Sequence, residues 1–347
     1  MVKKAKTLRV GVVGLGMGKH HVKAFQACTG CEVVAVCDTD ARRLKAYAGE
    51  QKIDKTFADA QAMFDAGLAD AVSIATPNFT HHPLTMAALE AGLHVLCEKP
   101  MALNAKQAQE MADTAVKRKR KLAIHFNHRM TPVARTIARY AQDGRLGEIY
   151  FARTVWHRRR GIPRGASGWF LQRKTAGGGC LIDLGVHILD GVLFPLGYPK
   201  ITSVSGQTYN RFGKVDVPDG KMDVDDFVVA QLRCESGAVI NVEVSWASHH
   251  EHPEQMILAL YGTEGGIVRR TENYQDAPLE IHHRDGANLA TTRLLTLDSG
   301  ASVQQDFVDA IAKDREPVCS AAHGLATMQI IDAIYESSRT GRQVELA

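Results

Sequence analysis

The chain has 347 residues, of which 45% are hydrophobic and 23% are charged, and its formal net charge is +4. This length exceeds one ordinary hydrophobic core and predicts two domains. The composition is typical of a globular protein. The small net charge argues against a nucleic-acid partner, because such proteins concentrate basic residues on one face. The basic run at residues 117–121 ends a predicted helix, where cations are common.

The sequence predicts a cytoplasmic protein with no membrane partner. The N-terminal segment passes directly into a strand-like run without the apolar region of a signal peptide, and no apolar run is long enough to cross a bilayer. Seven scattered cysteines predict reduced thiols. Cys28 and Cys31 form a CxxC pair without a second pair, and the histidines at 249–252 lack a carboxylate or cysteine frame. We therefore expect no metal site.

Short apolar runs alternate with helical segments over residues 1–126. The runs fall at residues 8–14, 31–38, 70–76, 93–99 and 121–126. Such runs are typical of parallel strands that are buried on both faces. Asn104 is the predicted N-cap of the helix before the last run, and Gly92 is the predicted stop of the helix before that. This alternation predicts an α/β fold, beginning with a Rossmann-type doubly wound parallel sheet.

Residues 127–347 follow a different pattern, typical of an α+β domain with a mostly antiparallel sheet. Two hairpins are predicted, with turns at residues 235–237 and 263–265. Two helices are predicted at residues 302–314 and 321–338, and the last one is a candidate for packing back on the first domain.

A glycine cluster follows the first predicted strand and precedes a helix. Gly14, Gly16 and Gly18 leave backbone bare beside a helix N-terminus, which favours a pyrophosphate. The spacing departs from G-x-G-x-x-G, so a tight turn without a ligand is the alternative. Asp38 ends the second strand, where an acid can bind the adenosine ribose, and this favours NAD. Arg42 and Arg43 lie close by in the sequence, so NADP stays open.

A second glycine cluster, Gly177 to Gly179, precedes an apolar segment that carries Asp183 and His187. Buried charged groups are costly without a partner or a task. Residues four apart share one face of a helix, so this acid and imidazole are expected to point to one side. The glycines are expected to leave the backbone bare beside a bulky ligand. The alternative is a structural Asp–His hydrogen bond in a helical core.

These motifs, together with Thr76-Pro77-Asn78, His81 and Glu98-Lys99-Pro100, resemble the Gfo/Idh/MocA oxidoreductases, which include sugar and inositol dehydrogenases. The resemblance implies Lys99, Asp183 and His187 as the catalytic set, with a homodimer or homotetramer as the assembly. It also implies that residues 127–347 bind the substrate and mediate oligomerisation. The residues that it and the glycine motif assign to the cofactor are Gly14, Gly16, Met17, Gly18, Asp38, Thr76, Asn78, His81, Glu98, Lys99 and Trp169.

The activity implied by the resemblance is hydride transfer between nicotinamide and a secondary hydroxyl of a sugar, cyclitol or sugar derivative. A histidine can take the hydroxyl proton near neutral pH, and a lysine can stabilise the developing alkoxide. Two alternatives stay open: an NAD-dependent glycoside-cleaving enzyme of the same fold, and a non-catalytic nucleotide-sensing regulator. Candidate substrate contacts are Asn127, Arg129 and Arg158.

Arg158 belongs to a group of arginines, completed by Arg159, Arg160 and Arg164, in a predicted loop before Trp169. These side chains have two interpretations. They can hold an acidic group of the substrate, or they can form ion pairs between subunits.

Overall fold

The computed structural model describes residues 7–163, 168–217, 222–273, 275–294 and 300–346. The chain divides into two compact units, which we call unit 1 (Met1–Asn127 with Ala301–Ala326) and unit 2 (His128–Gly300 with Thr327–Ala347). Unit 1 contains a six-stranded sheet and unit 2 a ten-stranded sheet. The predicted α/β fold class is confirmed.

The sheet of unit 1 is parallel throughout, as its apolar runs predict. Its strands are β1 (Leu8–Val13), β2 (Cys31–Cys37), β3 (Lys55–Phe57), β4 (Ala71–Ile74), β5 (His94–Cys97) and β6 (Leu122–Ile124). They are ordered β3-β2-β1-β4-β5-β6. The order reverses between β1 and β4, and doubly wound sheets bind their ligands at such a reversal, outside the carboxyl ends of the strands.

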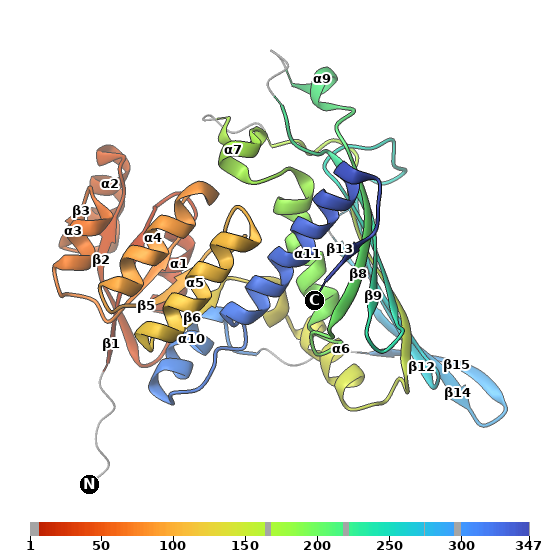
Figure 1. Ribbon diagram of the computed structural model, residues 1–347. Coiled ribbons are helices and arrows are strands. Elements are labelled where there is room, and N and C mark those ends of the chain that lie inside the picture. Colours follow the sequence, from red (N-terminus) through yellow and green to blue (C-terminus); the bar gives the residue numbers. More distant parts are fainter. Residues whose placement is uncertain (1–6, 164–167, 218–221, 274, 295–299, 347) are drawn as a thin grey trace, which may run out of the picture. The chain divides into compact units, whose positions relative to one another are not determined.

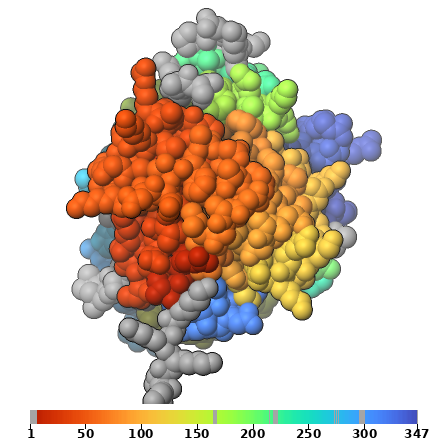
Figure 2. Space-filling view, turned by 90° about the vertical axis from the view of Figure 1, so that its left-hand side faces the viewer, coloured from red at the N-terminus to blue at the C-terminus, as the bar shows by residue number. Residues whose placement is uncertain are grey.

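Helices of the first 120 residues and one from near the C-terminus complete unit 1 (Figure 1). Figure 2 shows the surface that the first 120 residues form, coloured from red to yellow. They are α1 (Gly18–Gln26), α2 (Ala41–Gln51), α3 (Ala60–Asp65), α4 (Asn78–Glu90), α5 (Ala105–Arg118) and α10 (Val303–Ala312). The N-cap predicted at Asn104 is confirmed, because its side chain accepts a hydrogen bond from Gln107 N. Gly92 follows α4 with φ of +80°, which suits the predicted stop.

The sheet of unit 2 is antiparallel except where β7 pairs with β10. Its strands are β7 (Ile149–Arg158), β8 (Ile201–Tyr209), β9 (Phe227–Cys234), β10 (Val239–Ser245), β11 (Glu254–Gly262), β12 (Gly265–Glu272), β13 (Gln275–Asp276), β14 (Leu279–Asp285), β15 (Asn288–Leu294) and β16 (Val344–Glu345). The β9–β10 and β11–β12 pairs confirm both predicted hairpins. A further hairpin, β14–β15, extends from the end of the sheet (Figure 1).

Helices cover one face of this second sheet (Figure 1). The helical elements are η1 (Asn127–Met130), α6 (Pro132–Gln142), η2 (Trp169–Leu171), α7 (Arg173–Ala176), η3 (Leu181–Gly185), α8 (Val186–Leu193), α9 (Gly213–Asp216) and α11 (Ala321–Thr340). The apolar helix α8 packs on β7 and β11. This packing fixes the backbone of the segment that carries Asp183 and His187.

One helical run in the described residues, Arg173–Leu193, is long and apolar enough by composition to cross a membrane. This run consists of α7, η3 and α8, which follow one another closely. The sequence predicted no apolar stretch of this length. Of its apolar window, 83% is buried inside the structure. A core helix passes the same test, so the run is weak evidence for a membrane span.

Candidate functional site

The first glycine cluster forms a turn in which the three glycines have different surroundings. Gly14 has φ of +86°, and a Cβ there would lie 2.6 Å from the carbonyl oxygen of Ala75. A Cβ on Gly18 would lie 3.0 Å from Val12 Cγ1, so this glycine permits close packing of α1 on the sheet. Nothing lies within 4 Å of a Cβ at Gly16. The turn therefore leaves open backbone where a pyrophosphate would approach.

In a dinucleotide turn, glycines permit the tight turn, the approach of the pyrophosphate to the backbone, and the close packing of the helix. Gly14, Gly16 and Gly18 fit these three roles although their spacing is unusual. Met17, between the second and third glycine, is 59% exposed and leaves the interior of the turn free. The residues present fit a dinucleotide, because an open backbone precedes the N-terminus of α1 at the reversal of strand order.

Asp38 lies beside this turn and is held from several directions. Its carboxylate accepts hydrogen bonds from Leu15 N at 2.7 Å and Asp40 N at 2.8 Å. Arg43 donates to both carboxylate oxygens, each at 2.9 Å. Burial would raise the pKa of Asp38, but the Arg43 guanidinium and the two amides hold it below its ordinary value. The site therefore presents a fixed anion with a paired cation.

Three further cofactor candidates follow β4: Thr76 in the loop, and Asn78 and His81 in the first turn of α4. Thr76 accepts a hydrogen bond from the Thr80 hydroxyl at 2.7 Å, and the buried Asn78 begins α4. His81 is completely enclosed, with its ring nitrogens 2.8 Å from the Thr76 carbonyl and 2.7 Å from the Pro100 carbonyl. Burial lowers the pKa of His81 against the pull of the two carbonyls. Its position supports a role in joining two loops and not a direct cofactor contact.

Glu98 follows β5 and forms the centre of a network that sequence reasoning missed. Its Oε1 lies 2.8 Å from His21 Nε2 and 2.8 Å from His125 Nδ1. Its Oε2 accepts a hydrogen bond from Lys99 N at 2.9 Å. His125 directly follows β6, as Glu98 follows β5, and this shared position at the carboxyl edge of the sheet is the signal that could have paired them.

The Asp183 and His187 segment of unit 2 begins as a π-helix, η3, and continues as the α-helix α8. Asp183 is partly exposed, and its Oδ2 accepts a hydrogen bond from Trp246 Nε1 at 3.0 Å. Trp246 is fully buried, so its indole fixes the orientation of the carboxylate. No sequence signal joined Trp246, 63 residues away, to this acid. Single π-turns within helices are frequent at functional sites.

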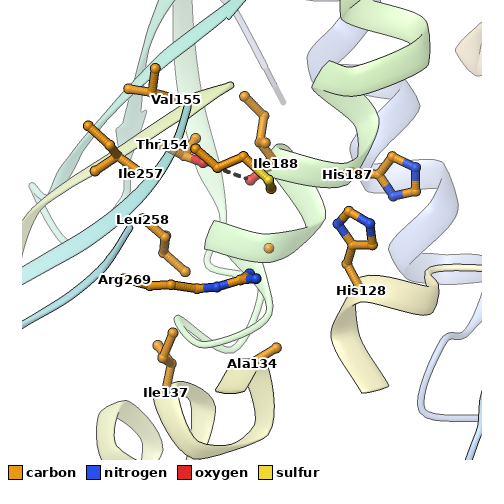
Figure 3. Close-up of a pocket in the computed structure, with 12 residues that line it drawn as sticks. His128, Ala134, Ile137, Thr154, Val155, His187, Ile188, Ile257, Leu258 and Arg269 are labelled. Atoms are coloured by element: carbon orange, nitrogen blue, oxygen red, sulfur yellow. Dashed lines mark hydrogen bonds between the residues drawn. The ribbon is translucent and has the colours of Figure 1, made fainter. Parts of the chain in front are cut away.

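His187 is 9% exposed and lies in an aromatic environment (Figure 3). The ring of His128 stacks on it, with centroids 4.4 Å apart and planes 19° apart. The Trp156 ring lies 6.0 Å from His187 and 5.6 Å from His128. Both histidines also line a cavity of about 40 Å³, together with Thr154, Arg269 and apolar side chains. The His187 ring is thereby confined.

The second glycine cluster has a different purpose from the one predicted. A Cβ on Gly179 would lie 1.8 Å from the Asp225 carbonyl oxygen, and a Cβ on Gly178 would lie 1.9 Å from the Tyr335 hydroxyl. Gly177, with φ of +87°, ends α7. The prediction that these glycines leave space for a ligand is therefore wrong for Gly178 and Gly179, because protein atoms fill the space.

Asp225 is the residue that these glycines approach. Its carboxylate accepts hydrogen bonds from Gly179 N and Leu181 N, both at 2.9 Å, and from the Tyr335 hydroxyl at 2.7 Å. The buried carboxylate therefore satisfies amides at the start of the helix that carries Asp183. Asp225 is a positioning residue that the sequence did not reveal.

The position of Arg129 does not support the predicted substrate contact. Its side chain is fully buried, forms an ion pair with Asp190 and donates a hydrogen bond to the Tyr198 hydroxyl at 2.8 Å. The guanidinium is therefore part of a buried ion pair and is not exposed to a substrate. Asn127, by contrast, is exposed at the start of η1.

The arginines before Trp169 do not all lie in a loop, because β7 extends to Arg158. The Arg158 guanidinium lies 5.2 Å from the centroid of the Trp156 ring. Arg159 donates hydrogen bonds to the carbonyls of His250 and Glu251, and Arg160 forms an ion pair with Asp216 at 3.2 Å. Arg164 lies outside the described residues. These three described arginines therefore have partners within the chain.

Trp169 begins η2, and its ring lies 4.2 Å from that of Phe170. Both rings are partly exposed. The Trp169 ring is therefore accessible at the surface of unit 2.

Family models match the chain in both units. Residues 8–126 match an oxidoreductase family with an NAD-binding Rossmann fold, and residues 134–268 match the GFO/IDH/MocA C-terminal domain. Among curated proteins, the chain is 32% identical to D-glucoside 3-dehydrogenase of Escherichia coli (strain K12), over 98% of this chain and 97% of that protein. It is 28% identical to inositol 2-dehydrogenase of Rhizobium meliloti (strain 1021), over 98% of this chain and 100% of that protein.

Solved structures of oxidoreductases are also similar to this chain over nearly its whole length. A levoglucosan dehydrogenase in complex with NADH and L-sorbose superposes with a TM-score of 0.88 at 26% identity, covering 99% of both chains. An oxidoreductase from Agrobacterium radiobacter in complex with NAD+, L-tartaric acid and magnesium gives a TM-score of 0.82 at 26% identity, covering 98% of both chains. The similarity therefore extends over the whole length of the chain.

Proposed function

Because the chain belongs to the Gfo/Idh/MocA family of NAD-binding oxidoreductases, we propose that it transfers a hydride between NAD and a secondary hydroxyl of a sugar or cyclitol. The observation that carries this proposal is full-length similarity to dehydrogenases, in a chain that keeps Lys99, Asp183 and His187. The substrate class follows the relatives, whose names specify a glucoside and an inositol.

The glycine turn and Asp38 are the proposed cofactor site. The turn amides and the N-terminus of α1 would bind the pyrophosphate, and Asp38 would accept hydrogen bonds from the adenosine ribose. A fixed carboxylate at this position repels a 2′-phosphate, which favours NAD over NADP. Once bound, the nicotinamide ring supplies the acceptor for the hydride.

The proton chemistry is assigned to three side chains that the family resemblance singles out. His187 accepts the proton of the substrate hydroxyl, because an imidazole exchanges protons near neutral pH. The Lys99 ammonium stabilises the negative charge that develops on the substrate oxygen. Asp183, oriented by Trp246, holds a neighbouring hydroxyl so that the reacting carbon faces the ring. The confinement of His187 by His128 supports this assignment, since a restricted ring is already oriented.

The test is a panel of sugars, glycosides, cyclitols and acidic sugars with NAD or NADP, followed by absorbance of the reduced nicotinamide. We expect His187→Asn to reduce kcat/KM for the best substrate by about 10²–10⁴-fold. Lys99→Met should also abolish most turnover while the dissociation constant for NAD+ stays within about threefold of the wild-type value, since lysine acts mainly on the transition state. Lys106→Met, an exposed lysine on α5, is the matched control and should be fully active.

Normal turnover by Lys99→Met would contradict its assignment. Release of an aglycone from a glycoside without net NADH would favour the glycoside-cleaving alternative. Binding of NAD without turnover of any compound in the panel would favour a regulator.

A further inference from the structure

The network around Glu98 lies where doubly wound sheets bind nucleotides. Glu98 and His125 directly follow β5 and β6, and His21 lies in the first turn of α1, just after the glycine turn. These residues belong to unit 1, as do their outer partners Ser73 and Gln304. Their arrangement can therefore be interpreted within one compact unit.

The hydrogen bonds determine which ring nitrogen of each histidine faces Glu98. His21 places Nε2 against Glu98 Oε1 and Nδ1 against the Ser73 hydroxyl, both at 2.8 Å. His125 places Nδ1 against the same carboxylate oxygen at 2.8 Å, and Gln304 Nε2 lies 3.0 Å from its other nitrogen. Each ring thus donates one N–H to Glu98, and His125 accepts a hydrogen bond from the Gln304 amide, which requires a neutral His125 ring.

This arrangement keeps a buried carboxylate charged. Burial would raise the pKa of Glu98, but His125 and His21 hold it well below its ordinary value. Burial also lowers the pKa of His21, so this ring resists taking a compensating proton. Near neutral pH the network therefore carries one net negative charge, and only 12% of the Glu98 side chain is exposed.

We propose that the Glu98 carboxylate, held by His21 and His125, makes the protein discriminate between the two redox forms of its cofactor and favours the cationic NAD+ over the neutral NADH. The inference rests on the proposed function. A dinucleotide with its adenosine half at Asp38 spans the reversal of strand order, so its nicotinamide half lies at the carboxyl ends of β4, β5 and β6, where Glu98 is. A buried anion attracts the positive ring of NAD+ and gains nothing from the neutral ring of NADH. At a separation of about 6 Å and an effective dielectric of about 40, between a protein surface and bulk water, the preference amounts to about tenfold in affinity.

The same three side chains also have a geometry that a divalent cation uses. One ligand atom from each of His21, Glu98 and His125 lies within 4.8 Å of the others. A bound cation would reverse the charge of the network and remove the preference for NAD+. The binding experiment therefore includes EDTA, which keeps the three side chains free of metal.

The experiment measures dissociation constants of the full-length protein for NAD+, NADH and ADP-ribose by calorimetry, in buffer with EDTA. Glu98→Gln, which removes the charge at constant size, should weaken NAD+ binding about tenfold and leave NADH and ADP-ribose within about twofold. Glu98→Asp should keep the wild-type ratio of the two affinities. Glu110→Gln, an exposed acid on α5 paired with His82, is the matched control.

Lys99 is present in the wild type and in every variant. The effect of its positive charge on the dissociation constants is therefore the same in all of them and cancels when they are compared. ADP-ribose lacks the nicotinamide ring, so its unchanged affinity shows that the dinucleotide turn is intact. If Glu98→Gln does not fold, Glu98→Ala removes the same charge and serves in its place.

Two results would overturn the inference: a parallel loss of NAD+ and NADH affinity in the charge-free variant, or no change in either. The binding experiment contains no sugar, so failure of this inference can be distinguished from failure of the proposed function. A protein with this preference that oxidises no sugar contradicts only the proposed activity. One that oxidises sugars with an unchanged ratio in Glu98→Gln contradicts only this inference.

Discussion

At the scale of single residues, Asp38 shows how one side chain can select a cofactor. Its carboxylate is fixed by two amides and by two nitrogens of the Arg43 guanidinium. A phosphate on the adenosine ribose would meet this fixed anion, whereas a free hydroxyl would find an acceptor. Arg43 is held in the pair with its side chain 46% exposed. Removing Asp38 would therefore release a cation where a phosphate needs one.

We predict that Asp38→Ala changes the cofactor preference toward NADP. The ratio of kcat/KM with NADP+ to that with NAD+ should rise by about tenfold or more, because a repulsion is removed and Arg43 is freed. Steady-state kinetics with both cofactors measures it. Asp54→Ala, which removes an exposed acid from the same unit, should leave the ratio unchanged. An unchanged ratio in Asp38→Ala would show that this carboxylate does not face the ribose.

At the scale of elements, the segment from Gly177 to Leu193 depends on close backbone approach at its start. Gly179 lies against the carbonyl of Asp225, whose carboxylate binds Gly179 N and Leu181 N. Gly191, later in α8, is different, because a Cβ at this position would meet nothing within 4 Å. The two glycines therefore differ in environment although they lie in one continuous helical run.

We predict opposite effects of alanine at these two glycines. Gly179→Ala should lower the free energy of unfolding by about 2–4 kcal/mol, because a methyl group would overlap a buried carbonyl. Gly191→Ala should change it by less than about 1 kcal/mol, toward higher stability, since alanine favours helix. Urea unfolding followed by circular dichroism measures both. Equal destabilisation by the two substitutions would refute the assignment of Gly179 to packing.

Sequence patterns predicted the elements whose signals are local. The five buried strands of unit 1, both hairpins and the two C-terminal helices were confirmed because apolar periodicity and turn residues determine them. The three-residue strand β3 and the six-residue helix α3 were missed, because such short segments carry little periodicity. The π-helix η3 was missed because it depends on packing with distant residues.

In the candidate site too, only the residues that belong to local sequence motifs could be predicted. Glycines, Asp38 and the residues of the resemblance could be identified from the sequence, since each is part of a motif. Trp246, Asp225 and the two histidines that bind Glu98 could not, because they meet their partners only through the tertiary fold. Arg129 was misassigned because its partner Asp190, 61 residues away, could not be foreseen.

At the scale of the whole molecule, buried histidines determine how stability depends on pH. Burial lowers the pKa of both His94 and His157 to about 4. The Nδ1 atom of His94 accepts a hydrogen bond from Lys121 N at 2.9 Å, which requires a neutral ring. His21 and His81 also have lowered pKa values because they are buried. Below the unfolded pKa of about 6.5, the unfolded chain therefore binds more protons than the folded chain.

We predict that the free energy of unfolding falls as the pH is lowered from 7 to 5. The sign follows because proton uptake by the unfolded state favours unfolding, and the loss continues until the pH passes the folded pKa of about 4. His94 and His157 should each contribute about 1 kcal/mol, since water still reaches both rings. Denaturant unfolding at several pH values measures the slope, and His94→Gln should reduce it. Greater stability at pH 5 than at pH 7 would contradict this prediction.

The most direct test of the central claim follows the hydrogen itself. A sugar or cyclitol substrate carrying deuterium at the oxidised carbon is incubated with the protein and NAD+, and the reduced cofactor is examined by mass spectrometry. Direct hydride transfer predicts one deuterium per NADH formed, with the corresponding ketone as the other product. Unlabelled NADH, or a product released without any NADH, would contradict the account.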